Sequence, residues 1–459
     1  MGVDSQGLSL RIYFPTSGKK QAVEVWTDFS LSEGFLDPLG SFSFTLYPTP
    51  ENFELMRERF AKGQSARLEV GGQPQMTGVV TTQTISMSRR GTSIRVDMKS
   101  MLAAPYEASV SPTYTLSSKS DIPISQLIMV LMAPYFYSSE RTDLLSLTSN
   151  VGTDLLARSG LPAGKYMMPA PVPITTLKAR QLKAKRGETV YSFISRIISR
   201  MGFILKTDAY GGLLLDVPLY GLPPMYTLAD AGGSGGDDAT DLMLDGITVI
   251  DSNDRQFSEV VVSGQALMRK PSGKGKAVNP LKGGKTPPKP GPVRANKPIG
   301  GVRVAGAVDV YSDDYANTNN WKAIPAGKKR MVFPYKSVAY KSLERGRHHY
   351  SSNQWQPYKP KYVEDKMSRD SARCEVFAEL LLGLKSPGGF KITCSVAGFQ
   401  AKTGALWTPN TVVRVKIDKL NIDEDMWIFA REFTASRGRG QITKLTLLPM
   451  GALVLGGLG

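Results

Sequence analysis

Gly404-Ala-Leu-Trp-Thr-Pro-Asn410 precedes three stretches in which apolar and polar residues alternate: Val412–Ile417, Trp427–Phe429 and Gln441–Leu447. Alternation of this kind is typical of strands that bury one face, and a glycine turn beside them favours antiparallel pairing. We therefore expect antiparallel β-structure in the C-terminal region, with Trp407 packed in its core.

The N-terminal part of the chain, residues 1–105, carries the same pattern. Thr49 and Pro50 are residue types that begin helices, so a short helix should follow, with Phe53, Met56 and Phe60 on its inner face. Strands with one helix in this order fit a β-barrel or sandwich that the helix plugs. The stretches expected to form strands are Leu8–Phe14, Val23–Phe29, Ser41–Leu46, Ala66–Val70, Met76–Met87 and Ser93–Met98.

Residues 106–240 differ in character, because two helices and a hairpin are predicted there. Asp121–Tyr135 has apolar residues at helical spacing, and Gly187–Met201 has the clearest amphipathic stripe of the chain. The Gly211-Gly212 pair then joins two short apolar stretches into a hairpin. This segment is expected to be an inserted α+β domain.

Strands are predicted again in residues 241–265, and Asp365–Leu384 is predicted to form a second amphipathic helix. Residues 241–265 and 361–449 together therefore repeat the strands-plus-helix pattern of 1–105. We predict a mainly β chain with α+β insertions, in which two tube-like β-barrels carry smaller inserted domains. The second barrel is discontinuous in sequence, and residues 450–459 form a C-terminal tail.

Residues 266–360 are a basic Pro/Gly-rich insertion followed by an irregular Tyr-rich part. The chain has 57 Lys and Arg against 40 Asp and Glu, a formal net charge of +17, and Met268–Val304 contains ten bases and no acid. Such a stretch cannot bury a core. It is either an arm that lies on an acidic neighbouring protein or a non-specific contact for DNA phosphates. The contact residues would be Lys274, Lys276, Lys282, Lys285 and Lys289.

The sequence offers little support for catalysis or metal binding. His348 and His349, the only histidines, are adjacent and would point to opposite faces of a strand. Asp423-Glu424-Asp425 sits in an expected hairpin turn, and nothing argues for the carboxyl pair, about 5–10 Å apart in a cleft, of a glycoside hydrolase. No phosphate loop, dinucleotide fingerprint, nucleophile elbow or metal-ligand spacing occurs. We therefore expect no enzyme, no catalytic residue, no metal and no cofactor.

The cysteines and the N-terminus bear on the compartment of the protein. Cys374 and Cys394 fall on apolar positions of an expected helix and strand, which favours free core thiols in a reducing compartment. There is no apolar signal-peptide core, and Gln6 replaces the hydroxyl residue of a myristoylation signal. No stretch approaches the roughly 18 apolar residues of a membrane span. We expect the protein to stay in a cytoplasm unless it leaves within a particle.

Short motifs in a fixed order connect the chain with a known family. The series resembles the baseplate hub proteins of contractile-tailed phages, in particular the Mu-like hub and the late control protein D group. It covers about residues 1–265 and 361–449, whereas 266–360 is longer and more basic than the family core and Lys99-Ser100 departs from the usual family ending. The motifs are Met76–Val80, Ile94–Met98, Ser100–Ala104, Gly187–Val190, Gly211-Gly212, Asp251–Arg255, Phe257-Ser258, Val262–Gln265, Asp365–Leu384, Gly398 and Gly404–Asn410.

The resemblance implies a fused pair of tail-tube barrels, three copies of which form a ring. A ring of six barrel units would join a sixfold tail tube to a threefold central spike and leave an axial channel for DNA. The partners would be two further copies in a homotrimer, a tail-tube or tube-initiator protein, the spike, and baseplate wedge or neighbouring tail proteins. DNA in transit would be contacted non-specifically. The structural signature residues would be Gly264, Gln265, Gly404, Leu406, Trp407, Pro409 and Asn410.

The same resemblance implies a location. The protein would be assembled in the host bacterial cytoplasm and would reside in the virion, in the baseplate of the phage tail. Two other functions stay open beside the hub. One is a tail-associated protein that binds or degrades the cell wall, for which Asp423 and Asp425 would be the residues to substitute. The other is a DNA-binding protein that uses residues 268–304.

Overall fold

The structure is a computed structural model in which the chain divides into two compact units. One comprises residues 1–250 and 391–450, the other residues 251–390 and 451–459. The first unit carries the main sheet and the second carries smaller sheets. The described residues are 10–13, 20–21, 26–89, 91–111, 121–136, 147–149, 176–178, 184–199, 203–220, 222–230, 240–244, 246–252, 259–264, 302–304, 308–309, 331–332, 360–365, 381, 389–436, 440–450 and 452–453.

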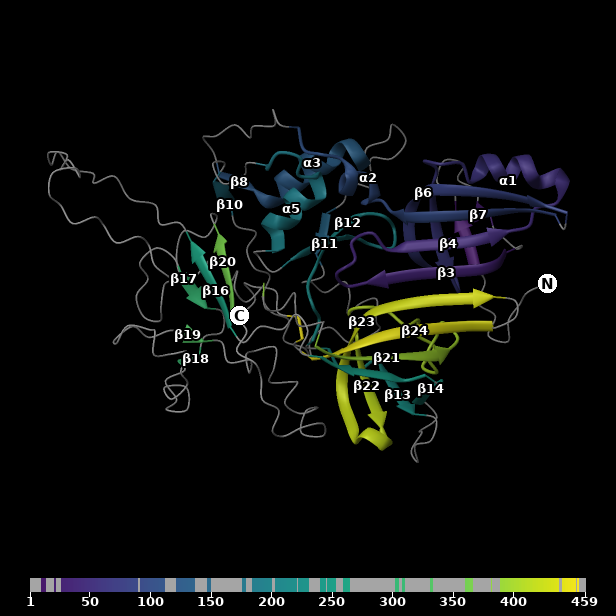
Figure 1. Ribbon diagram of the computed structural model, residues 1–459. Coiled ribbons are helices and arrows are strands. Elements are labelled where there is room, and N and C mark those ends of the chain that lie inside the picture. Colours follow the sequence, from purple (N-terminus) through teal and green to yellow (C-terminus); the bar gives the residue numbers. More distant parts are fainter. Residues whose placement is uncertain are drawn as a thin grey trace, which may run out of the picture. The chain divides into compact units, whose positions relative to one another are not determined.

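A closed ring of six strands forms the C-terminal barrel of the first unit (Figure 1). Around the ring, β21 pairs with β14, β14 with β13, β13 with β22, β22 with β23, β23 with β24, and β24 again with β21. The pairs β13–β14 and β13–β22 are parallel, and the others are antiparallel. The strands are β13 Tyr226–Asp230, β14 Thr240–Met243, β21 Phe390–Ala397, β22 Val412–Ile417, β23 Ile422–Ser436 and β24 Gly440–Pro449.

The residue ranges that form this barrel differ from the predicted ranges, 241–265 and 361–449. Its N-terminal contribution is β13 and β14, which begin at Tyr226. β15 Thr248–Asp251 pairs with β21 at the edge of the sheet, and β16 Glu259–Gly264 belongs to another sheet. Sequence alternation could not separate these strands, because a short apolar stretch carries no information about which sheet it joins.

The N-terminal strands continue the same sheet in the order β3–β4–β7–β6–β5–β1–β2. In the residues that the structure describes, no pairing joins β2 back to β3, so this part forms a long ladder. All its pairings are antiparallel, which agrees with the alternation that is typical of antiparallel sheets with one buried face. The strands are β1 Leu10–Tyr13, β2 Lys20–Gln21, β3 Trp26–Gly34, β4 Ser41–Leu46, β5 Ser65–Val70, β6 Gln73–Ser88 and β7 Gly91–Ser100.

The predicted helix of this part is confirmed, with a 3-10 turn η1 Pro50–Asn52 leading into α1 Phe53–Arg59. Thr49 has an extended backbone but makes no side-chain cap hydrogen bond. Of the expected inner residues, Phe60 just beyond the helix is 1% exposed and packs edge-on against Phe44, with ring centroids 5.0 Å apart. Phe53 and Met56 are only half-buried.

Strand β23 joins the two parts (Figure 1). Residues 422–427 pair with β22 inside the C-terminal barrel, and residues 430–436 pair along the same edge with β3. The register of β23 against β24 shifts between Ile428 and Ala430, where the change of partner occurs. One edge of a single strand thus closes the barrel and starts the N-terminal ladder.

The inserted segment contains the predicted helices and hairpin. The helix expected at 121–135 is α3 Ile124–Phe136, and that expected at 187–201 is α5 Val190–Ile198, whose N-cap Thr189 accepts a hydrogen bond from Ser192 N at 3.2 Å. The hairpin is β11 Ile204–Thr207 paired with β12 Leu213–Asp216. Further elements are α2 Ala103–Glu107, β8 Asp121–Pro123, β9 Leu147–Ser149 and β10 Thr176–Lys178.

The cores of the barrel and of the ladder merge through aromatic contacts. Phe399 lies 5.9 Å from Phe29 and 4.7 Å from Phe433, measured between ring centroids. Phe35 of the turn after β3 meets Trp427 of β23 at 4.8 Å. Because these rings come from both parts, the two cores form one continuous apolar interior, and the barrel and the ladder stabilise each other.

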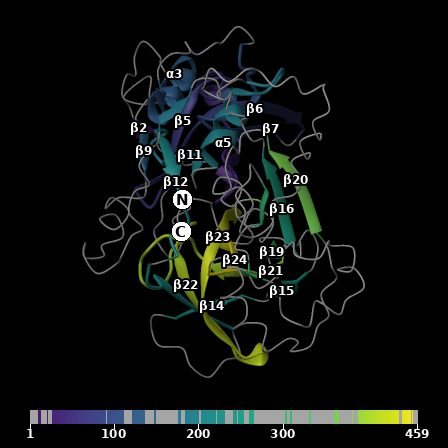
Figure 2. The same ribbon diagram turned by 90° about the vertical axis from the view of Figure 1, so that its left-hand side faces the viewer.

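In the second unit, β16 lies beside β20 (Figure 2) and has a second partner, β17, on its other side (Figure 1). It pairs antiparallel with β17 Val302–Val304 and parallel with β20 Pro360–Asp365. A separate antiparallel pair is β18 Val308–Asp309 with β19 Met331–Val332. Nearly all of the helix predicted at 365–384, and most of the basic stretch 268–304, lie outside the described residues. Among the helices that the structure describes, none is long and apolar enough to cross a membrane.

Candidate functional site

The described part of the chain contains no group of three or more His, Cys, Asp or Glu residues that could hold a metal ion. Asp423 and Asp425, the acids that a hydrolase would use, lie on strand β23 and not in the expected hairpin turn; Asp425 is opposite Arg414 of β22, and Asp423 is opposite Lys416. Arg414 donates to the two carboxylates at 2.8 and 3.1 Å. Their geometry is therefore that of a cross-strand charge ladder, and the notable chemistry of the unit lies in its interior.

The segment Gly404–Asn410 is a tight loop between β21 and β22. Gly404 has φ +81°, a left-handed conformation that favours glycine, and its N–H donates to Ala401 O at 2.8 Å. Trp407 N then donates to Phe399 O at 3.1 Å, which fixes the loop to the end of β21. Trp407 is fully buried, and Leu406 is 4% exposed. The loop thus directs two large apolar side chains into the core.

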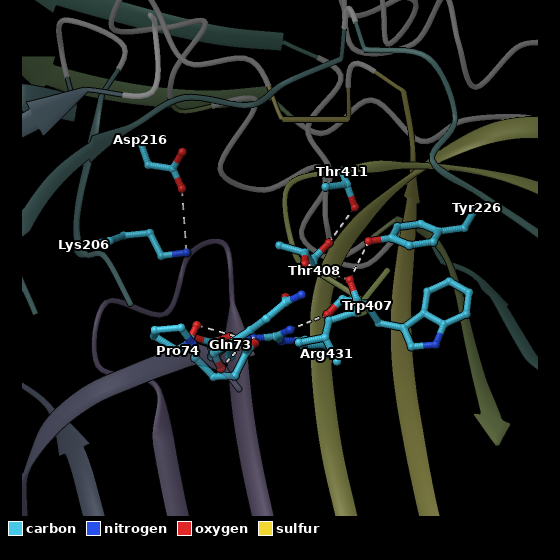
Figure 3. Close-up of polar contacts among 12 residues, drawn as sticks. Gln73, Pro74, Lys206, Asp216, Tyr226, Trp407, Thr408, Thr411 and Arg431 are labelled. Atoms are coloured by element: carbon cyan, nitrogen blue, oxygen red, sulfur yellow. Dashed lines mark hydrogen bonds and ion pairs between the residues drawn. The ribbon is translucent and has the colours of Figure 1, made fainter. Parts of the chain in front are cut away.

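Trp407 packs against Tyr226 of β13 (Figure 3). The ring centroids are 4.5 Å apart, and Tyr226 Oη donates to Leu406 O at 2.7 Å. Burial raises the pKa of the Tyr226 phenol, although hydrogen bonds from Thr408 and Thr411 and the charge of Arg431 act in the opposite direction. This hydroxyl is therefore neutral and serves to hold the loop.

Asn410 ends the loop and forms the centre of a buried polar network. Its backbone has φ +65°, which Asn tolerates better than other residues with a Cβ. Its Oδ1 accepts from Leu219 N at 2.9 Å and from Trp427 Nε1 at 3.0 Å. Its Nδ2 donates to Asp216 Oδ1 at 2.9 Å and to Val217 O at 2.8 Å. Every hydrogen-bonding position of the amide is thus occupied.

Asp216 and Lys206 extend this network into the inserted hairpin. Lys206 Nζ lies 3.7 Å from Asp216 Oδ2 and 5.4 Å from the centre of the Phe35 ring. Burial raises the pKa of the Asp216 carboxyl to about 6, against the lowering effects of Lys206, of Val217 N and of Asn410. The hairpin turn is also tied to the N-terminal ladder, because Thr77 Oγ1 donates to Ala209 O at 2.8 Å.

Arg431 of β23 is the main polar link between the barrel and the ladder (Figure 3). It is 4% exposed and donates through Nε to Glu33 Oε2 of β3 at 3.0 Å and through NH2 to Gln75 Oε1 of β6 at 2.7 Å. Its NH1 donates to Trp407 O. A guanidinium presents donors in a fixed planar fork, so one side chain can hold three segments in one geometry.

Five of the structural signature residues predicted from the sequence lie together in this region. Leu406, Trp407, Pro409 and Asn410 lie in one loop with Gly404. Gly264 ends β16 in the other unit. The residues Gln265, Lys274, Lys276, Lys282, Lys285 and Lys289 lie outside the described residues, as do Cys374, His348 and His349.

Sequence reasoning did not identify Arg431, Glu33, Lys206 or Asp216. Arg431 carried a usable signal, because it occupies an inward position in the alternation that continues through Phe433 and Ala435. A base at an inward position of a strand requires a buried partner. The partner itself, Glu33, is 398 residues away in sequence and carries no local signal.

Comparisons with known proteins bear on the same region. Residues 386–449, which contain β21 to β24 and the Gly404–Asn410 loop, match the family model for the C-terminal domain of NMB1110-like tail proteins. A search of curated protein sequences found no match.

Solved structures similar to this chain include two tail proteins. The tail protein of Neisseria meningitidis MC58 is similar with a TM-score of 0.59 and 18% identity over 96% of this chain and 96% of that chain. The 43 kDa tail protein of prophage MuSo2 from Shewanella oneidensis gives a TM-score of 0.59 and 14% identity, over 97% and 99% of the two chains. The chain therefore has a fold found in phage tail proteins, and its residues 386–449 match a tail-protein C-terminal domain.

Proposed function

We propose that the protein is a structural baseplate hub of a phage tail. Three copies would form a ring that joins the sixfold tail tube to the threefold central spike and leaves an axial channel for DNA. The observation that carries this proposal is the fusion of a six-stranded barrel with a second antiparallel ladder in one continuous sheet. Two such sheet bodies per chain supply six in a trimer, which is the number that a sixfold tube requires.

The junction between the two bodies supports this assignment. A part that adapts one symmetry to another must hold its two halves at a fixed angle, because each half meets a different neighbour. Here β23 pairs with both halves, and Arg431 is bonded to Glu33, Gln75 and the Trp407 carbonyl. Removing one partner of a buried charge pair is strongly destabilising, so these contacts hold the two halves together.

The partners in this proposal are two further copies of the chain, a tail-tube or tube-initiator protein, the spike, and wedge or neighbouring tail proteins. The protein has no catalytic role, is assembled in the host bacterial cytoplasm and resides in the virion. Residues 268–304, with their ten bases, serve as an arm on an acidic neighbour or contact DNA phosphates in transit.

Native mass spectrometry of the purified full-length chain tests the proposal. A species of three times 50.0 kDa is expected. The same copy number should appear in tail particles, counted against the tube protein. A chain that stays monomeric and never joins tail particles would contradict the assignment. Deletion of 268–304 should leave the trimer intact but weaken tail assembly if this segment is an arm, and should abolish salt-sensitive DNA binding if it contacts DNA.

The cell-wall alternative is less well supported, because Arg414 is hydrogen-bonded to both of the acids that it would use. Replacing Asp423 and Asp425 by Asn should leave any clearing of peptidoglycan by the chain unchanged. A clearing activity that disappears in this double variant would favour the alternative over the hub.

A further inference from the structure

On one face of the continuous sheet, a central patch is made almost entirely of short hydroxyl side chains. We call it the hydroxyl face and define it by the outward residues of β4 between 41 and 45, of β3 between 28 and 32, and of β23 between 432 and 436. Seven of these nine positions are Ser or Thr, and the other two are Asp28 and Glu432. The hydroxyl residues are Ser30, Ser32, Ser41, Ser43, Thr45, Thr434 and Ser436.

Strand register places these residues side by side across the junction of the two sheet bodies. Ser30 of β3 is opposite Ser43 of β4 on one side and opposite Thr434 of β23 on the other. Neighbouring rows are Ser41–Ser32–Glu432 and Thr45–Asp28–Ser436. Side chains directly opposite each other in an antiparallel pair lie on the same face. The hydroxyl face is therefore continuous from the barrel to the ladder.

The alternate residues of the same strands point into the core. Phe29, Leu31, Phe42, Phe44 and Phe433 are each at most 3% exposed. The hydroxyl residues between them are partly or fully exposed. The hydroxyl face is thus the outer surface of the sheet, on the side opposite to the aromatic interior and to Phe60 after α1.

The composition of this face fits neither an ordinary strand surface nor a protein interface. Strands favour β-branched and aromatic residues, and serine, which supplies five of the nine positions, is neither. Protein interfaces are rich in Tyr, Trp, Phe, Met and Arg and poor in Ser. None of these anchor residues occurs at the nine positions. The face is therefore built to remain wet and to project little beyond the backbone.

Its electrostatics are also distinctive in a chain of net charge +17, because the nine positions contain no Lys or Arg. Bases occur on the flanking strands, where Lys99 of β7 is opposite Ser41 and the other two have an acid nearby. Arg95 of β7 is 3.2 Å from Asp97, and Lys444 of β24 is opposite Glu432. DNA is held on proteins mainly through Lys and Arg contacts to its phosphates. The centre of the hydroxyl face offers duplex DNA no such contact.

We propose that the hydroxyl face lines the axial channel and is the surface past which double-stranded DNA moves. The inference rests on the proposed function, because a channel requires the ring. Short side chains keep the channel wide, water covers the hydroxyl groups, and the absence of central bases prevents the phosphates from being retained. The positive charge of the chain is placed elsewhere, where it does not slow transit.

Thiol labelling of the assembled ring tests the position of the face. Ser43→Cys on the ladder and Thr434→Cys on the barrel place one thiol each on the hydroxyl face, and both changes are close in size. Thr248→Cys on the exposed edge strand β15 is the matched control, and the unsubstituted chain measures the background, including buried Cys394. Each ring is treated with a small methanethiosulfonate reagent and with a bulky polyethylene-glycol maleimide.

The expected result is that the two face thiols react with the small reagent, lose their reaction with the bulky reagent on ring formation, and regain it when the ring is dissociated. Equal reaction of these thiols with both reagents in the ring would place the face on the outside. No reaction with either reagent would place it in a protein interface. Each of these last two outcomes would overturn the proposal.

A second test adds the charge that the face lacks. Rings carrying Ser30→Lys and Ser43→Lys should capture linear duplex DNA more strongly than unsubstituted rings, in a salt-sensitive way. Their capture of covalently closed circular DNA should not rise, because a circle cannot thread a preformed ring. Rings with Thr248→Lys should capture linear and circular DNA to the same extent. Equal gains for linear and circular DNA with the face variant, or no gain for either, would reject the channel assignment.

The two tests separate this inference from the proposed function. Native mass spectrometry decides whether a trimeric ring exists, and the labelling pattern decides which surface faces its channel. A trimer whose face thiols stay open to the bulky reagent would leave the hub standing and remove only the channel surface. Without a ring, both proposals fail.

Discussion

Replacing Asn410 by Ala should destabilise the first unit far more than a loop substitution normally does. The change removes four side-chain hydrogen bonds, those with Leu219 N, Trp427 Nε1, Asp216 Oδ1 and Val217 O. Each bond contributes about 1 kcal/mol, and partners left buried without a bond add to the cost, so we expect the network to contribute about 4 kcal/mol. A further 1 kcal/mol or so arises because Ala is disfavoured at a φ of +65°.

The chain supplies a matched control at Asn421, where the same substitution removes only the second contribution. Asn421 also has a left-handed backbone, with φ +47°, but its side chain is exposed in the turn between β22 and β23. Asn421→Ala should therefore cost about 1 kcal/mol.

The assay is urea unfolding of the full-length chain. Tryptophan fluorescence is the readout, because Trp427 is a member of the network. The midpoint of Asn410→Ala should fall well below that of Asn421→Ala. Equal midpoints would refute the argument that the amide network, rather than the turn conformation, is what Asn410 provides.

Three more predictions concern other buried groups of the first unit. Arg431→Met should lower the free energy of unfolding by about 3–5 kcal/mol, because it leaves the partly buried Glu33 without its partner. Arg431→Lys should lower it by a similar amount, because an ammonium cannot reach three acceptors in one plane. Urea unfolding measures both variants. Asp216 binds a proton at a pKa of about 6 when folded and near 4 when unfolded, so lowering the pH from 7 to 4 should raise stability through this group by about 2 kcal/mol. Asp216→Asn should remove that component, measured as the difference between the two pH–stability curves. A Cβ on Gly78 would lie 2.1 Å from Lys99 O, so Gly78→Ala should disrupt the β6–β7 pairing. A Cβ on Gly34 would have no atom nearer than 3.5 Å, so Gly34→Ala should be tolerated. Thermal melting followed by circular dichroism compares the two variants.

Much of the fold could be predicted because its signals are local. Ser41–Leu46 alternates strictly in sequence and is the strand β4 with those bounds. The helical stripe of residues 187–201 and the Gly211-Gly212 hairpin are likewise present as α5 and β11–β12. The mainly β class follows from such stretches, since each carries its own periodicity.

The pairing of distant strands could not be predicted in the same way. Nothing in Tyr226–Asp230 indicates that it lies between β14 and β22, in two parallel pairings. The second barrel was therefore expected to begin near residue 241, whereas its first strand begins at Tyr226. Partner choice depends on the whole sheet and not on the strand itself.

The candidate site was predicted only in outline. The glycine turn and the burial of Trp407 followed from residue types, but the role of Asn410 depends on Asp216 and Leu219, which are more than 190 residues away. Likewise, the side-chain partners of Arg431, Gln75 and Glu33, lie 356 and 398 residues away. Polar networks between remote segments leave no periodic trace, so the sequence could indicate a buried charge but not its partners.

Strand β23 also has a mechanical consequence. Its residues 422–427 are bonded to the barrel and its residues 430–436 to the ladder, so an axial pull on one body reaches the other along covalent peptide bonds. The hydrogen bonds that hold β23 on each side run across the strand and would be loaded in shear, with many of them sharing the force at once. A chain built in this way can carry tension without a weak joint between its two halves.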